Sequence, residues 1–146
     1  DRNDQTINEI WLDNSPIPKK NIHFIKAELG LLEARVEYEN TLKKFDKFDI
    51  VLLSMGEDGH IASLFPNHVY PEDQTVVVEN NSPKPPKQRI SMSYQQFNKA
   101  HYIFTLIIGE SKQKAVTLLE QNTNLPIVKV TGECEKLYIC KNAIYQ

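Results

Sequence analysis

Hydrophobic residues in this chain fall into short runs and periodic sets, which predict strands alternating with helices. The continuous run Ile50–Leu53 is typical of a strand buried on both faces of a parallel sheet. Residues 101–108 predict a second apolar strand, and Gly109 turns the chain after it. Shorter strands or extended segments are predicted at 21–25, 75–79, 89–92, 127–130 and 137–140.

Apolar residues spaced three and four apart predict helices between these strands. Ile7, Ile10 and Trp11 mark a short amphipathic helix, with Asn3 or Asp4 as its cap. The same spacing, continued over a longer segment, predicts a second helix across residues 31–45, and it predicts a later helix around 115–119. Ser93 begins a capping-box pattern, S-Y-Q-Q, and Ala62–Phe65 predicts a helical turn. The order of strand, helix and strand favours right-handed crossovers in a parallel sheet, within one domain over 1–146.

Composition narrows the class of protein without naming a function. The 146 residues are 40% hydrophobic and 25% charged, and the net charge is -2. These values are typical of a globular domain, and no apolar run approaches the roughly 18 residues of a membrane span, so we expect no membrane segment. No broad basic face is indicated, so we expect no nucleic-acid partner. Cys134 and Cys140 lack the spacing of a zinc or redox motif; we interpret them as reduced cysteines and expect no metal and no cofactor.

The loop after Ile50–Leu53 carries the residues best suited to chemistry. Gly56 and Gly59, with Ser54, allow a tight turn and a close approach of the backbone to a ligand. Asp58 and His60 place a carboxylate and an imidazole on this turn, at the carboxyl end of a strand, where open α/β sheets bind their ligands. Imidazole, with a reference pKa of about 6.5, accepts a proton near neutral pH. Asp58 has an alternative interpretation as a residue that only forms the turn.

Two ordered motifs resemble those of the 6-phosphogluconolactonase family. M-G-E-D-G-H-I-A-S-L-F-P at 55–66 is similar to the family's G-x-G-x-D-G-H-x-A-S-L-F-P, with Ser54 where glycine is usual. S-P-K-P-P-K-Q-R-I-S at 82–91 resembles S-P-K-P-P-x-x-R-I-[ST]. The resemblance implies a Rossmann-like α/β fold, with an open, mostly parallel sheet and helices on both faces. It also implies hydrolysis of a small sugar-phosphate lactone, 6-phospho-D-glucono-1,5-lactone, in the cytoplasm.

The resemblance also suggests a role for each candidate residue. His60 is expected to be the general base that activates water, and Asp58 to orient it or to bind a sugar hydroxyl. Lys84, held by three prolines, and the forked guanidinium of Arg89 suit a phosphate group, although solvated surface charge is the alternative. Lys112, in G-E-S-K, is expected to add a cation at a helix start or to lie exposed there.

The resemblance covers only the later part of a typical family member. The family's S-G-G-x-[ST] phosphate loop and its Asp-Glu-Arg motif have no counterpart before residue 1. We therefore expect the domain to lack N-terminal strands and part of its site, and we expect a monomer when the protein is full length.

Two other functions remain open at this point. Related glucosamine-6-phosphate deaminases continue D-G-H-I-G-F-N-E-P, with a glutamate five residues after the histidine, whereas this chain has Phe65 there. An apolar ring cannot tune the imidazole as a carboxylate does. A non-catalytic sugar-phosphate-binding domain on the same scaffold would need ligand affinity but no base, so retention of His60 argues mildly against it.

Overall fold

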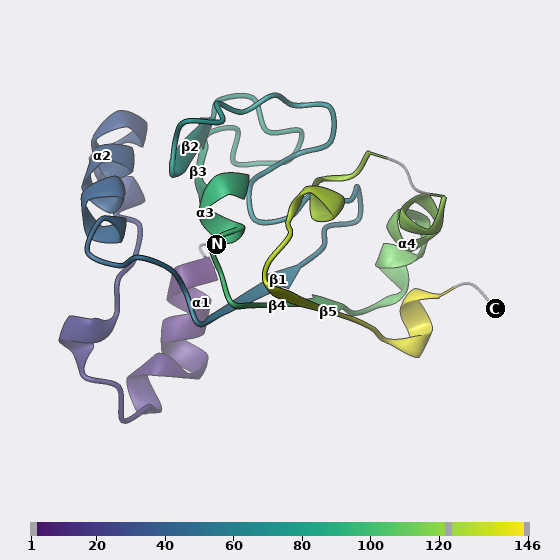
Figure 1. Cartoon of the computed structure of the whole chain (residues 1–146), viewed down its shortest axis with the longest axis horizontal. Helices are drawn as coiled ribbons and strands as arrows, with labels where there is room; N and C mark the ends of the chain where they lie inside the picture. Colours follow the sequence, from purple (N-terminus) through teal and green to yellow (C-terminus); the bar gives the residue numbers. More distant parts are fainter. Residues whose placement is uncertain (1–2, 122–123, 145–146) are drawn as a thin grey trace.

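A parallel sheet forms the base of the computed structural model, which describes residues 3–121 and 124–144. Its three strands lie in the order β1-β4-β5, and all pair in parallel (Figure 1). A separate antiparallel hairpin is formed by β2 and β3. The strand bounds are β1 Ile50–Ser54, β2 Val76–Glu79, β3 Arg89–Met92, β4 Tyr102–Ile107 and β5 Cys134–Ile139. The predicted parallel α/β class is thus confirmed.

Four α-helices accompany the strands within the described ranges: α1 Asn3–Ile10, α2 Leu31–Leu42, α3 Tyr94–Phe97 and α4 Gln113–Glu120. Short 3₁₀ turns are η1 Leu12–Asn14, η2 Lys19–Asn21, η3 Ala27–Leu29, η4 Glu110–Lys112, η5 Pro126–Lys129 and η6 Lys141–Ala143. The capping prediction is confirmed, because the Ser93 hydroxyl accepts a hydrogen bond from the Gln96 amide at 3.2 Å. Across the described residues, no helix is long and apolar enough to cross a membrane.

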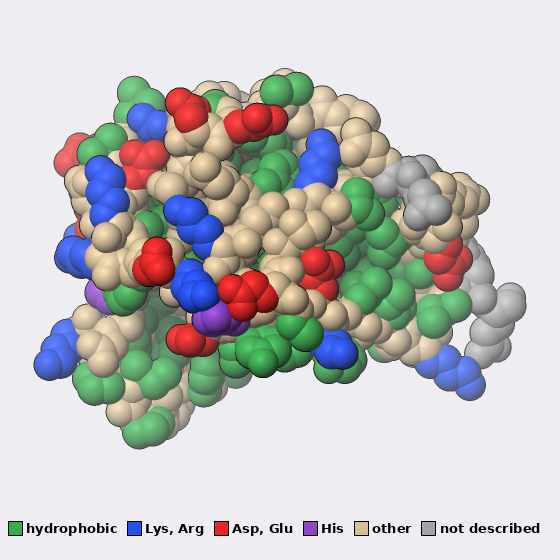
Figure 2. Space-filling model, in the orientation of Figure 1, with side chains coloured by type: hydrophobic (Ala, Val, Ile, Leu, Met, Phe, Trp, Pro, Cys, Tyr) green, Lys and Arg blue, Asp and Glu red, His purple; other side chains and the backbone are tan. Residues whose placement is uncertain are grey.

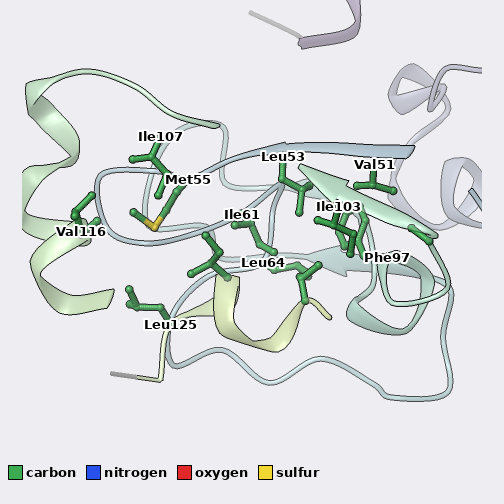
Figure 3. Close-up of a cluster of buried hydrophobic side chains, with 14 of the residues drawn as sticks. Val51, Leu53, Met55, Ile61, Leu64, Phe97, Ile103, Ile107, Val116 and Leu125 are labelled. Atoms are coloured by element: carbon green, nitrogen blue, oxygen red, sulfur yellow. The ribbon is translucent and has the colours of Figure 1, made fainter. Parts of the chain in front are cut away.

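The core lies on one face of the sheet. Val51 and Leu53 of β1 point into it, as do Ile103 and Ile107 of β4. Helices α3 and α4, the η5 turn and the loop after β1 supply the opposing side chains, and Figure 3 shows these groups meeting in one cluster. The further buried members are Met55, Ile61, Leu64, Val77, Phe97, Ala100, Ala115, Val116, Leu125, Ile127, Val130 and Ala143.

The other face of the sheet is exposed. Burial along β1 alternates, with Ile50 and Leu52 open to solvent, so the prediction that this strand is buried on both faces is wrong. Their register partners in β4 are the aromatic residues Tyr102 and Phe104. The Phe104 ring lies 6.2 Å from the ring of Tyr102 and 6.2 Å from that of Tyr138 in β5. Figure 2 shows hydrophobic side chains along the underside of the sheet. Among the described helices, α3 and α4 pack on the covered face.

Three local predictions are wrong. Residues 21–25 form no strand, and the 3₁₀ turn η2 ends at Asn21 instead. Residues 127–130 largely belong to the η5 turn, where Pro126 at its first position supplies the fixed φ that a helical start favours. Ala62–Phe65 does not form a helical turn. Ile61 and Leu64 exchange backbone hydrogen bonds across a tight turn, in which Ala62 has φ 47°.

The parallel register places two loops at one edge of the sheet. Ser54, the last residue of β1, pairs with Leu106 near the end of β4. The loop that carries Asp58 and His60 therefore leaves the sheet beside the loop that leads to Gly109 and η4. The carboxyl ends of parallel strands are where ligands bind in open α/β folds, so the candidate residues of both loops share that edge.

Candidate active site

The loop after β1 closes on itself through backbone hydrogen bonds. The Gly56 amide donates to the His60 carbonyl at 2.7 Å, and the Gly59 amide donates to the Gly56 carbonyl at 3.0 Å. Gly59 has φ 86°, a conformation that favours glycine. A Cβ at Gly56 would lie 2.1 Å from Cε1 and Nδ1 of His60. The imidazole of His60 is thus the group that needs the space at Gly56, and a close approach of this backbone to a ligand stays a prediction.

Asp58 and His60 form a directly bonded pair. Oδ1 of Asp58 accepts a hydrogen bond from His60 Nδ1 at 2.5 Å and from the His60 amide at 3.3 Å. The backbone bond forms the turn and the ring bond orients the imidazole, so Asp58 does more than form the turn. Binding of a sugar hydroxyl by Asp58 stays a prediction. Because Nδ1 donates, neutral His60 carries its free lone pair on Nε2. Burial raises the pKa of Asp58, but the hydrogen bond and charge of His60 outweigh it, so the pKa is lowered and the carboxylate stays ionised.

Lys84 comes from a distant loop and forms an ion pair with Glu57. Nζ of Lys84 lies 3.2 Å from Oε2 of Glu57. Glu57 directly precedes Asp58 in the loop that carries the family motif, residues 55–66, which we call the signature loop. The hydrogen bond and charge of Lys84, then the charge of Lys112, lower the pKa of Glu57, and a hydrogen bond from Ser111 adds to the effect. The structure therefore pairs Lys84 directly with Glu57, and Lys112 acts on Glu57 only through its charge.

Arg89 is directed at the backbone of the proline-rich turn. Its Nη2 donates to the carbonyls of Lys84 at 3.2 Å and Pro85 at 3.0 Å, and its Nε donates to the carbonyl of Pro86 at 3.2 Å. Ser82 holds the same turn from the other side, where its hydroxyl donates to the Lys84 carbonyl at 2.7 Å. In this structure the guanidinium fork supports the segment that carries Lys84. A direct contact between Arg89 and a phosphate stays a prediction.

Phe65 forms a wall of the site. Its ring is 1% exposed and lies 4.8 Å from the His60 ring, tilted by 37°. The guanidinium of Arg89 lies over the same ring at 5.5 Å. An apolar group thus contacts the imidazole where the deaminase pattern has a carboxylate.

Comparisons with known proteins agree with this arrangement. A family model described as "Glucosamine-6-phosphate isomerases/6-phosphogluconolactonase" matches residues 1–139. The chain belongs to this family. The 6-phosphogluconolactonase of Thermotoga maritima is 31% identical over 132 residues, which make up 90% of this chain and 60% of that relative. The 6-phosphogluconolactonase 3 of Arabidopsis thaliana, a chloroplastic protein, is 34% identical over 143 residues, covering 86% of this chain and 44% of the relative.

Solved structures of the family share the fold. The crystal structure of 6-phosphogluconolactonase from Thermotoga maritima superposes with a TM-score of 0.85 at 30% identity, covering 92% of this chain and 63% of that structure. A monomeric glucosamine-6-phosphate deaminase superposes with a TM-score of 0.76 at 24% identity, which shows the fold alone. This chain therefore spans less than two thirds of the length of these family members.

Sequence reasoning missed a second polar group behind the family's signature loop. Glu79 is buried at the end of β2, where its Oε2 accepts hydrogen bonds from Tyr70 at 2.8 Å and from Nδ1 of His68 at 2.6 Å. His68 is thus a hydrogen-bonded partner and not a simple surface or packing residue. The only sequence signal was that Glu79 follows directly after three valines, and an acidic residue at the end of an apolar run is not by itself a sign of burial.

Two hollows of the described surface are not lined by His60. One, of about 280 Å³, is lined by Tyr70, Pro71, Glu72, Ser93, Tyr94, Gln95 and Lys129. Another, of about 310 Å³, lies over β5 and the η5 turn. Neither is lined by His60 or Lys84, so the residues suited to chemistry are gathered at a sheet edge and not inside either hollow.

Proposed function

We propose that the intact protein hydrolyses 6-phospho-D-glucono-1,5-lactone to 6-phospho-D-gluconate. The observation that carries this proposal is the Asp58–His60 pair, which leaves Nε2 as the basic nitrogen on the loop that defines the family's lactonase motif. The relatives from Thermotoga maritima and Arabidopsis thaliana are called 6-phosphogluconolactonases, and they support the same substrate.

The reaction needs one proton acceptor that later becomes a donor. Nε2 of His60 takes a proton from water, and the hydroxide formed attacks the lactone carbonyl carbon. The tetrahedral intermediate collapses, the bond from that carbon to the ring oxygen breaks, and the imidazolium returns its proton to this oxygen. Asp58 stabilises the imidazolium through its ionised carboxylate. All atoms of the lactone and of water are then accounted for in the open acid.

Binding of the phosphate falls to the cations at the other side of the loop. Lys84 and Lys112 act together on Glu57, which supports a shared place for a negatively charged group. A phosphate with up to two negative charges would replace the carboxylate as the partner of Lys84. We also propose that Arg89 contributes by its charge, in addition to the bonds by which it holds the turn.

Phe65 favours the lactonase over the deaminase. The deaminase pattern places a further carboxylate five residues after the histidine, whereas here the buried ring of Phe65 lies against the imidazole and Asp58 is the carboxylate bonded to it. The family description contains both activities, and this contact supports the lactonase.

The test is a pair of assays on the intact protein, one with the lactone and one with glucosamine 6-phosphate. We expect lactone hydrolysis only, and we expect His60→Ala to lower kcat by about 10²–10⁴ while affinity for 6-phosphogluconate changes by only a few fold. His23→Ala, which alters an exposed histidine outside the site, is the matched control and should keep wild-type turnover. Unchanged turnover in His60→Ala, after subtraction of spontaneous hydrolysis, would exclude His60 as the base.

A further inference from the structure

Glu79 is a buried carboxylate that the proposed reaction does not use. It is 6% exposed, and both of its oxygens accept hydrogen bonds. Burial raises the pKa of this carboxyl group, but the hydrogen bonds from the Asn81 amide, His68 and Tyr70 outweigh burial, so its pKa is lowered. An ionised group kept in the interior is costly unless its partners compensate for the lost water. Those partners belong to two different loops.

Oxygen Oε2 of Glu79 reaches the His60 loop through one hydroxyl. Tyr70 donates to it at 2.8 Å, and the same hydroxyl accepts a hydrogen bond from the Phe65 amide at 3.0 Å. Burial raises the pKa of Tyr70, so its hydroxyl keeps the proton that it donates. The position of Phe65 therefore depends on Glu79, and the Phe65 ring is the one that lies against His60.

Oxygen Oε1 of Glu79 reaches the loop of Lys84. It accepts a hydrogen bond from the Asn81 amide at 2.6 Å, one residue before the serine that binds the Lys84 carbonyl. Across the hairpin, Arg89 is the register partner of Glu79 and holds the Lys84 carbonyl as well. One end of the β2–β3 hairpin thus supports both loops.

We propose that Glu79 is a positioning residue, which sets the placement of His60 relative to Lys84 by fixing Phe65 with one carboxylate oxygen and the Lys84 turn with the other. The roles of His60 and Lys84 as base and phosphate ligand rest on the proposed function. Productive geometry is sensitive to displacements of about 1 Å, so a shared anchor beneath both loops has a direct effect on rate.

The first experiment measures the surroundings of His60 without using activity. In the intact protein labelled at histidine, NMR records the ring resonances of His60, assigned by the His60→Ala spectrum. Phe65→Leu removes the ring current of the neighbouring phenyl group and gives a reference shift. We expect Glu79→Gln and Tyr70→Phe to move the His60 resonances part of the way to this reference. Asp73→Asn, which removes one exposed charge near β2, is the matched control and should leave them in place.

The second experiment measures the consequence for turnover. We expect Glu79→Gln to lower kcat/KM for the lactone by about tenfold or more, and Tyr70→Phe by less, since it removes only the link to Phe65. In a Phe65→Leu background, Tyr70→Phe should cost less than it does alone, because both changes act on the same contact.

Each outcome decides one question. Unmoved His60 resonances in Tyr70→Phe and Glu79→Gln overturn the positioning role, and Tyr70→Phe decides alone if Glu79→Gln does not fold. Wild-type kcat/KM in Glu79→Gln, beside an inactive His60→Ala, also overturns it and leaves the lactonase proposal intact. Shifted resonances in a protein that does not hydrolyse the lactone support the positioning role and refute the proposed function.

Discussion

The two faces of the sheet differ sharply although the same strands form both. Leu53 is 8% exposed on the covered face, whereas its neighbour Leu52 is 64% exposed on the open face. Helices α3 and α4 and the signature loop pack on the covered face, and every candidate residue lies on a loop at the carboxyl edge or on the hairpin above it. The candidate residues thus lie above the packed core. The open face presents exposed apolar side chains, which usually mark a surface that contacts another protein segment or a ligand.

The largest effect should come from comparing a chain of these 146 residues with a version extended upstream to the length of its relatives. We expect the shorter chain to self-associate through the open face and to be at least about a hundredfold less active, because family phosphate sites draw on several loops of the sheet. Light scattering and a lactonase assay on both versions make the measurement.

A solubilised variant separates the two losses. Leu52→Lys with Tyr138→Lys should reduce association of the shorter chain without raising its activity, since both side chains are exposed on the open face of the sheet. A shorter chain that is monodisperse and fully active would contradict the expectation, and would mean that these residues contain a complete site.

Next in size is the contrast between adjacent leucines in β1. Leu53→Ala should lower the free energy of unfolding by about 2–4 kcal/mol, because it leaves a cavity in the core. Leu52→Ala should cost less than about 1 kcal/mol. Urea titrations of both variants in the intact protein give the comparison. An equal and large loss at Leu52 would show that residues beyond the described ones bury the open face.

A smaller difference is expected between two lysines on opposite sides of the sheet. Lys84→Ala should weaken binding of 6-phosphogluconate by about tenfold and of gluconate hardly at all, because the proposed ligand of this lysine is the phosphate. Lys136→Ala, an exposed lysine in register with Phe104 on the open face, is the control and should change neither. Titration calorimetry with both ligands checks this. Equal losses for both ligands would assign Lys84 to folding or to the sugar.

The smallest effect concerns acid stability. The pKa of Asp58 is lowered in the folded protein, so the unfolded chain binds more protons and the stabilisation is lost as pH falls below the ordinary value of 3.8. Asp58→Asn should therefore flatten the acid side of the stability profile, by less than about 1 kcal/mol because the pair is partly exposed. Urea unfolding from pH 7 to pH 3 measures it, with Asp73→Asn as control. A steeper acid limb in the variant would reverse the sign argued here.

Much of the strand pattern could be predicted because local sequence determines it. Tyr102–Ile107 and Arg89–Met92 form strands as their apolar and β-branched residues indicate. The run Ile50–Leu53 was correctly assigned as a strand but not as a doubly buried one. Burial of alternate residues depends on what packs against each face, and that information is distributed over distant parts of the chain.

The site was predictable where one loop carries it and not where the fold brings loops together. Asp58 and His60 are two residues apart, so their pairing follows from a tight turn. The bridge from Glu79 through Tyr70 to Phe65 joins β2 to a preceding loop, and no spacing in the sequence predicts it. Arg89 illustrates the same limit, because its charge is visible in the sequence but the carbonyls it binds are not.

The ion pair of Lys84 with Glu57 makes the carboxylate an internal competitor for the lysine. Both side chains are about half exposed to solvent, so the pair contributes little to stability, and salt weakens it further. A phosphate dianion that binds Lys84 replaces Glu57 as the partner of the lysine. It binds more strongly than the carboxylate mainly because it carries a second negative charge. Monoanionic sugar acids offer no such surplus over Glu57. Glu57 therefore holds Lys84 in place when no ligand is bound, and a ligand with a single negative charge gains little by replacing Glu57.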